Sequence, residues 1–480
     1  MLTGKRIRYE VADRTRAIGV GGLGAIHNMA RRVGLVDAID RNLNVLRVHL
    51  PYHESDHVLN IAYNLLAGGD RLEDIELLRN DEAYLDALGA QRIPDPTTAG
   101  DFCRRFTPDD IEALHSAINS VRLNVWRQQP DAFFDEAVID ADGVIVETLG
   151  ECKVGMEYSR KGVWGFHPLV LSLANTQEPL YIVNRSGNRP SHEGAAEYFD
   201  RAAALAREAG FRLITFRGDT DFSQTTHLDK WHAQGIRFIF GMDAAPNLVE
   251  KANNLERSAW RRLERNPKYV VKTEPREKAE RVKESLVVER EFDNIRLLSE
   301  DVAEFDYRPS ACKTTFRIVV VRKNLSVERG EKRLFDDFRY FFYITNDAVT
   351  AAAEIVFTAN QRCNQENLLA QLKSEVRALH APVNDLVSNW AYMVMASLAW
   401  TLKAWFALLL PETGTRAARR GEEKRTTLSM EFKRFVNAFV RIPAQVIRAG
   451  RRIVLRVLAW NPSQRIFFRA VDRIASPMRC

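Results

Sequence analysis

The spacing of apolar residues changes twice along this chain of 480 residues, and the change limits the folds that it can adopt. Up to about residue 130 apolar positions recur at helical spacing, and that spacing returns from about residue 351. Between these stretches lie short runs rich in Val, Ile, Leu and Phe, which are typical of buried strands. The runs cover residues 137–148, 167–175, 178–186, 213–219 and 236–243. With a helical segment at 195–209 between the third and fourth runs, this order predicts an α/β fold with a mixed sheet.

Helices are expected on both sides of this strand-rich segment. The N-terminal candidates span residues 23–36, 55–66, 72–78 and 82–88, and Ser55 is the expected cap of the second. Residues 94–106 indicate a proline turn followed by a Thr-capped helix that exposes Arg104 and Arg105. This segment fits a DNA-binding helix-turn-helix element, and it fits a plain packing helix equally well. A further helix is expected over 361–378.

The stretch 386–410 is apolar enough to raise the question of a membrane span. Asn389 and Lys403 interrupt it, and it stands alone in the sequence. We therefore expect a buried core helix and no membrane partner, with a single membrane span as the alternative.

Composition narrows the class of protein. Hydrophobic residues at 46% and charged residues at 28% are near the globular average, which argues against wholesale disorder and against a protein with many membrane spans. The five cysteines are scattered singly without a CxxC pair, so a structural zinc site is not expected. The first residues lack the apolar run of a signal peptide, and a cytoplasmic, nucleoid-associated location is the expectation.

The net charge of +6 is distributed unevenly. Residues 413–480 contain 16 Lys and Arg against 4 acidic residues, a net +12, whereas the other 53 basic and 59 acidic residues give −6. Clustered cations such as Arg451 and Arg452 suit contact with the DNA backbone, because each neutralised phosphate releases counterions. A solvated helix face or a patch for anionic membranes explains the charge equally well.

Three acidic positions near strand ends or on a helix suggest a site. Asp140 and Asp142 follow an apolar strand and project from the same face, and Asp219 ends another apolar strand. Ligand sites of open α/β sheets commonly lie where strands end. On the expected helix over 361–378, Arg362, Glu366 and Lys373 share one face. Taken singly, these patterns are also typical of turn residues and of surface ion pairs.

The motifs DADG at 140–143, RGDTDF at 217–222 and RCNQENLLAQLK at 362–373 together resemble the DDE transposases of bacterial insertion sequences. They resemble in particular the group whose ribonuclease-H-like domain is interrupted by a β-strand insertion. The third motif of that group has Tyr, two residues, Arg, three residues, Glu, six residues and Lys. Arg362, Glu366 and Lys373 match this spacing, whereas Ala359 stands at the Tyr position. Gly143 stands where the family usually has Thr or Ser.

The resemblance implies a set of roles. The catalytic triad falls on Asp142, Asp219 and Glu366, which would hold two Mg²⁺ ions, with Mn²⁺ as a substitute, and Asp140 is a second candidate for the first metal ligand. Arg362 and Lys373 would bind phosphates. The family also implies double-stranded DNA as partner, in the form of transposon ends and target, a hairpin intermediate and a homodimeric synaptic complex.

The spacing of the motifs indicates the domain organisation. The 146 residues between Asp219 and Glu366 exceed what one strand-and-helix step needs, so an inserted domain is expected. Strand-like runs at 283–288, 316–321 and 340–345 predict that it is rich in β-structure. The expected units are a helical DNA-binding domain at 1–130, a ribonuclease-H-like catalytic domain at 131–246 and 346–410, the insertion at 247–345 and a basic helical region at 411–480.

The function predicted from the sequence is cut-and-paste DNA transposition. Two alternatives share parts of the pattern: a ribonuclease-H-like nuclease or resolvase without strand transfer, and an inactive transposase-derived DNA-binding regulator. The Asp, Asp, Glu, Arg and Lys set argues against the regulator, whereas Ala359 and Gly143 argue weakly for it.

Overall fold

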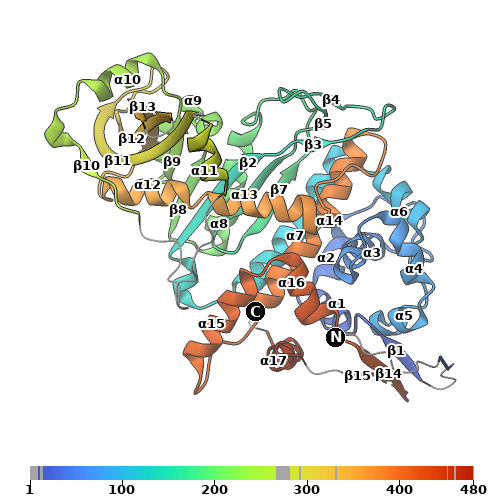
Figure 1. The fold of residues 1–480 in the computed structure, drawn as a ribbon. Coiled ribbons are helices and arrows are strands. Elements are labelled where there is room, and N and C mark those ends of the chain that lie inside the picture. Colours follow the sequence, from blue (N-terminus) through green and yellow to red (C-terminus); the bar gives the residue numbers. More distant parts are fainter. Residues whose placement is uncertain are drawn as a thin grey trace.

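A nine-stranded sheet runs through the centre of the computed structural model and carries elements from most of the chain (Figure 1). The structure describes residues 9–10, 15–265, 282–290, 293–329, 332–450, 452–458 and 461–478. The strand order in the sheet is β10-β11-β12-β13-β9-β8-β2-β6-β7. In Figure 1 the insertion strands lie at one end of the molecule and the N-terminal helices at the other.

Five of these strands form the predicted mixed sheet. They are β2 (Glu136–Gly143), β6 (Leu169–Leu173), β7 (Glu178–Val183), β8 (Leu213–Gly218) and β9 (Arg237–Met242). β2, β6 and β7 pair antiparallel in chain order, and β8 and β9 then add in parallel on the other side of β2. The predicted α/β fold with a mixed sheet is therefore confirmed. A separate small sheet contains β3 (Val146–Glu147), β4 (Glu157–Tyr158) and β5 (Trp164–Phe166).

The β-rich insertion extends the same sheet instead of forming a second one. It contains α10 (Pro246–Asn253), β10 (Arg261–Arg262), α11 (Val282–Glu289), β11 (Asp293–Tyr307), β12 (Phe316–Arg329) and β13 (Lys332–Thr345). β13 pairs antiparallel with β9, which joins the insertion to the catalytic strands. The prediction of a strand over 283–288 is wrong, because α11 occupies these residues. A short apolar run does not distinguish strand from helix by its period alone.

Helices cover both faces of the central strands. α8 (Ala195–Ala209) packs its Phe199 ring 4.5 Å from that of Phe216 on β8, and α9 (Thr225–Ala233) follows. On the opposite face lie α12 (Ala352–Asn360) and α13 (Cys363–Ala370), followed by a π-helical turn over Gln371–Glu375. The single helix predicted over 361–378 is thus wrong in its bounds, since the chain breaks between α12 and α13.

Seven helices make up the N-terminal part of the described chain. They are α1 (Leu23–Arg32), α2 (Leu35–Asn42), α3 (Glu54–Ala67), α4 (Ile75–Arg79), α5 (Glu82–Leu88), α6 (Pro96–Cys103) and α7 (Pro108–Trp126). The helix expected over 23–36 is divided at Gly34, whose φ of 88° suits glycine. Two expected caps are also wrong. Ser55 lies inside α3, and α6 is capped by Asp95, which accepts a hydrogen bond from the Thr98 amide at 2.9 Å.

The apolar helix α14 (Leu386–Leu408) lies in the core of the molecule. It is long and apolar enough to span a membrane, yet its apolar window is wholly buried within the protein. A buried carboxylate connects it to two other elements: Glu178 of β7 accepts hydrogen bonds from Arg122, Trp126 and Trp405 at 3.0, 3.0 and 2.8 Å. The structure therefore favours the core-helix expectation over a membrane span.

The C-terminal region is a mixture of helices and strands, so the prediction that it is helical is wrong. It contains α15 (Ala417–Leu428), α16 (Phe432–Phe435), β14 (Ala444–Ala449), β15 (Arg452–Val457) and α17 (Gln464–Ala475). β14 and β15 pair as a hairpin, and β1 (Arg16–Ile18) from the N-terminal part adds to it. Gly450, with φ of 60°, follows β14 and allows the chain to reverse. The two strands pair with each other across this turn and β14 also pairs with β1, which is distant in sequence, and a search for helical periodicity does not reveal such pairing.

Candidate active site

Two aspartates meet at one edge of the central sheet. Asp142 lies near the end of β2, and Asp219 follows the last residue of β8. β2 and β8 are parallel neighbours, with Asp140 opposite Arg217, so their carboxyl ends reach the same edge. Glu366 lies on α13, which packs over this face. Sequence elements more than 220 residues apart therefore converge at this edge.

The guanidinium of Arg362 lies among these three carboxylates. Its Nη1 donates to Oδ2 of Asp142 at 3.0 Å, and its Nη2 is 3.8 Å from Oδ2 of Asp219 and 3.6 Å from Oε1 of Glu366. Exposure increases across the site: the side chains of Asp142 and Arg362 are 15% and 18% exposed, and that of Glu366 is 60% exposed. The site is thus open to solvent on the side of Glu366.

Burial and charge shift the pKa values of both aspartates. Burial raises the pKa of Asp142 to about 6, with Arg362 opposing the rise and the charge of Asp219 adding to it. Burial also raises the pKa of Asp219, again against the effect of Arg362. Carboxylates gathered in this way are stabilised in their charged forms by a nearby cation.

Asp140 has a different environment from Asp142. It is 1% exposed, and both of its oxygens accept hydrogen bonds from Arg217 at 2.7 Å. Arg217 in turn donates to the carbonyl of Thr358 at 2.8 Å, next to the start of the third motif. The structure therefore places Asp140 in a buried ion pair, apart from the three carboxylates around Arg362.

Two residues that position the site were not identified from the sequence. Arg217 binds Asp140, and its only signal in the sequence was its position on β8, two residues before Asp219. Gln365 donates to the carbonyl of Val170 at 3.1 Å and pairs with Ser172, which fixes α13 against β6. Gln365 precedes Glu366 in the chain, but no spacing rule distinguishes it from a surface residue.

Lys373 is held away from the carboxylates in this conformation. It lies in the π-helical turn after α13, and its Nζ donates to the carbonyl of Ile145 at 2.9 Å. Its ammonium thus binds the chain just beyond β2. The shared helical face predicted for Arg362, Glu366 and Lys373 is therefore only partly formed, because the π-helical turn changes the direction of the third residue.

The donor chemistry of the three carboxylates fits a divalent cation. Hard cations such as Mg²⁺ prefer carboxylate oxygens and retain several water ligands. In the described parts of the chain, however, no three acidic, His or Cys side chains lie close enough together to form a metal site. The spacing of Asp142, Asp219 and Glu366 is instead the spacing that suits the guanidinium between them.

A cavity of about 400 Å³ opens beside the carboxylates, between α13 and the insertion strand β13. Asp219, Arg362 and Glu366 line it together with Tyr340 and Tyr343. Ala359, at the position of the family tyrosine, lines it as well. The insertion therefore contributes an aromatic wall to the site. The ring centre of Trp260 lies 4.2 Å from the guanidinium carbon of Arg322, and the ring packs near Tyr340.

Steric hindrance explains why position 143 is a glycine. A Cβ added there would lie 2.6 Å from Nε2 of His167. The His167 ring is itself held by Nδ1, which lies 2.8 Å from the carbonyl of Arg189. This histidine thus occupies the space beside the end of β2 that a Thr or Ser side chain would need.

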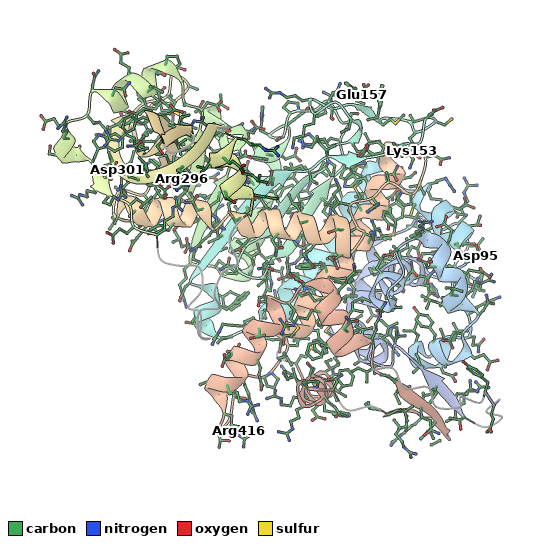
Figure 2. The ribbon with its side chains drawn as sticks, in the orientation of Figure 1. Asp95, Lys153, Glu157, Arg296, Asp301 and Arg416 are labelled. Carbon is green, nitrogen blue, oxygen red and sulfur yellow. The ribbon has the colours of Figure 1, made fainter. Side chains whose placement is uncertain are left out.

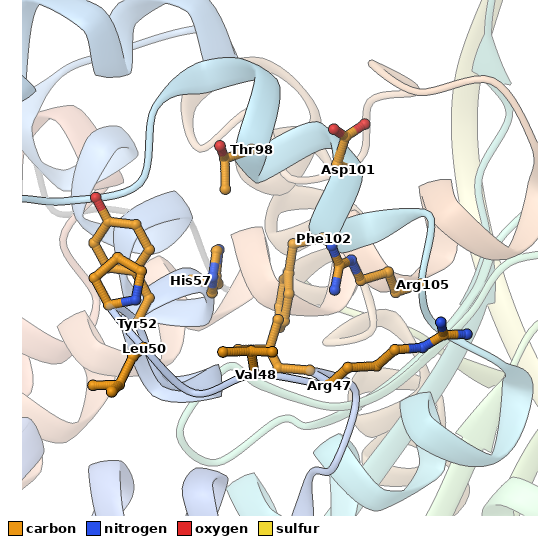
Figure 3. Close-up of a pocket in the computed structure, with 11 residues that line it drawn as sticks. Arg47, Val48, Leu50, Tyr52, His57, Thr98, Asp101, Phe102 and Arg105 are labelled. Atoms are coloured by element: carbon orange, nitrogen blue, oxygen red, sulfur yellow. The ribbon is translucent and has the colours of Figure 1, made fainter.

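Unlike Arg362, the candidate DNA-binding residues Arg104, Arg105 and Arg452 do not line the cavity beside the carboxylates. Arg105 lines a second cavity, of about 390 Å³, together with Arg47, Tyr52, the buried His57 and Phe102 (Figure 3). Arg104 pairs with Asp101 at 2.6 Å. Arg452 is exposed on β15, and Arg451 lies outside the described residues. Figure 2 shows Arg416, at the start of the C-terminal region, at the bottom of the view, whereas Asp301 of the insertion lies at the upper left.

The chain is similar to known proteins in sequence family and in fold. A family model described as transposase DDE domain group 1 matches residues 5–478. Among solved structures, the piggyBac transposase synaptic complex with hairpin DNA matches with a TM-score of 0.39 and 9% identity, over 89% of this chain and 82% of that chain. No curated protein sequence matches the chain.

Proposed function

This chain belongs to the transposase DDE domain group 1 family, and we propose that it cuts DNA at the ends of its own insertion sequence and joins these ends to a target. The observation that carries the proposal is the convergence of Asp142, Asp219 and Glu366 at one edge of the sheet. These three carboxylates belong to the first, second and third motif, in that order along the chain. We place the activity in the cytoplasm, on nucleoid DNA.

The proposed site residues divide into two groups. Asp142, Asp219 and Glu366 would hold a pair of Mg²⁺ ions, for which Mn²⁺ substitutes. Such ions activate a water or 3′-hydroxyl nucleophile and stabilise the leaving oxygen of an in-line displacement. Arg362 binds a phosphate of the cleaved strand through two parallel N–H bonds, and Lys373 binds another as a point charge. Asp140 is assigned a positioning role through Arg217.

DNA contacts outside the site are proposed for both ends of the chain. Arg105 and Arg47 flank a cavity on the N-terminal helices, and Arg452 lies on the exposed hairpin of the C-terminal region. We propose that these cations bind the backbone of the terminal inverted repeats, with Arg104 and Arg451 as further contacts. Two copies of the chain would hold the two ends in a synaptic complex, and the ends would pass through hairpins.

The test is incubation of the purified chain with Mg²⁺ and a DNA fragment that carries the sequences flanking its gene. Strand-transfer products, with hairpin ends as intermediates on a denaturing gel, are the expected result. Nicking without joining would indicate a nuclease or resolvase instead. Binding without any cleavage would indicate a regulator. The Glu366→Gln protein and a reaction with EDTA are the controls that assign products to this site.

A further inference from the structure

Arg362 makes more contacts with the active-site acids than a phosphate-binding residue needs. Its one guanidinium reaches Asp142, Asp219 and Glu366, at 3.0, 3.8 and 3.6 Å. The side chain is largely buried, although it begins at the exposed break between α12 and α13. A single positive charge thus lies among three negative ones, and two negative charges remain in excess.

This position has two physical consequences. First, the guanidinium reduces the repulsion between carboxylates that would otherwise face one another in a partly buried space. Second, its planar fork relates the positions of the carboxylates, because Nη1 binds Asp142 while Nη2 lies near both Asp219 and Glu366. Arg362 therefore both neutralises and positions the three acids.

The same contacts put Arg362 in competition with a divalent cation. Oδ2 of Asp142 accepts from Arg362, and Oδ1 of Asp142 accepts from the amide of Gly143 at 2.8 Å. Each oxygen of Asp142, the most buried of the three acids around Arg362, therefore already accepts one hydrogen bond. A cation between all three acids would take the position that the guanidinium now occupies, and the cavity that Arg362 also lines offers the guanidinium space to move.

We propose that Arg362 is an exchangeable internal counter-ion, which occupies the carboxylate site until a divalent cation replaces it and frees its guanidinium for a DNA phosphate. The inference rests on the proposed function, because it assigns regulation to the same site. It couples the two ligands: a phosphate that draws Arg362 away makes the acids available, so DNA and metal each strengthen the binding of the other.

The test measures Mn²⁺ binding to the full chain without DNA, by the electron paramagnetic resonance signal of the free ion. We expect Arg362→Gln to bind Mn²⁺ roughly tenfold more tightly than the wild type, since the competitor is gone. Arg339→Gln is the matched control, because Arg339 is exposed on β13 and pairs only with Asp337 among the described residues. Its affinity should equal that of the wild type.

A second pair of variants distinguishes failure of this inference from failure of the proposed function. Asp219→Asn should weaken Mn²⁺ binding in both the wild-type and the Arg362→Gln background. If Asp219→Asn does so but Arg362→Gln binds no more tightly than the wild type, the counter-ion role is wrong and the proposed metal site stands. If Asp219→Asn changes nothing in either background, both proposals are overturned.

A measurement on the wild-type chain tests the inference even if the Arg362→Gln variant misfolds. Phenylglyoxal modifies accessible guanidinium groups, and mass spectrometry can follow its reaction with Arg362. We expect the modification rate to rise with Mg²⁺ concentration, because the displaced side chain becomes accessible, while Arg339 reacts at a constant rate. A rate for Arg362 that does not change with Mg²⁺ would overturn the inference.

Discussion

The catalytic edge of the sheet and the C-terminal region both contain many charged side chains, but these side chains are paired differently in the two regions. At the edge, charges from distant elements converge on Arg362 and form one site. In the C-terminal region many cations are instead bound to acids nearby: Arg448 to Asp86, Lys424 to Glu412 and Arg469 to Glu423. The net charge of a segment therefore does not tell which of its cations are available to DNA.

The largest expected effect is at the catalytic edge. Glu366→Gln and Asp219→Asn should each lower DNA cleavage by at least about 10³-fold, because several kcal/mol of transition-state charge stabilisation are lost. Glu354→Gln, on the exposed face of α12, is the control and should cleave normally. Rates are measured on a labelled end fragment. Wild-type cleavage by Glu366→Gln would show that this edge is not the active site.

Asp140 and Asp142, two residues apart on β2, allow a structural role to be distinguished from a catalytic one. Asp140→Asn should lower the free energy of unfolding by about 3–5 kcal/mol, because it leaves buried Arg217 without its charged partner. Asp142→Asn should cost far less stability and abolish cleavage. Urea unfolding followed by circular dichroism gives the first quantity. If Asp140→Asn remains stable but inactive, Asp140 is a ligand after all.

Lys403 connects the core to the C-terminal region and should make stability depend on pH. Its ammonium is fully buried against Trp400 and donates to the carbonyl of Leu428 at 2.8 Å. Burial lowers the pKa of Lys403 to about 7, so above pH 7 the unfolded chain binds more protons and stability rises with pH towards 10.5.

Replacement of this lysine removes the cost of burying an amine. Lys403→Met should therefore stabilise the protein by at least about 1 kcal/mol at pH 7, and the gain should shrink as the pH approaches 10. Melting curves across this pH range provide the measurement. A gain that does not depend on pH would mean that packing, not charge, causes it.

The smallest expected effect concerns the availability of basic residues to DNA. Arg452→Gln should reduce the slope of log affinity against log salt concentration by about 0.9, the value for one phosphate contact. Arg448→Gln should leave that slope unchanged, because Arg448 is already bound to Asp86. Fluorescence anisotropy with end DNA at several salt concentrations checks both. Equal effects of the two variants on the slope would contradict the inference that pairing with an acid makes an arginine unavailable to DNA.

The sequence predicted elements well where their pattern is local. The alternating and apolar runs of the central strands, and the long helix α14, have enough apolar residues of one period to be recognised. The split at Gly34, the helix α11 and the hairpin of β14 and β15 were missed. Each depends on a turn geometry or on a partner strand, and neither is visible in the period of a short segment.

The sequence by itself determined the mixed α/β fold, the need for an insertion and the acids that the family motifs share. These follow from hydrophobic period, chain length and residue spacing, which are properties of the chain alone. Only the tertiary structure decided that Asp140 binds Arg217 and that Arg362 lies among Asp142, Asp219 and Glu366. Ion pairing depends on distance and burial in three dimensions, and the order of residues in a chain specifies neither.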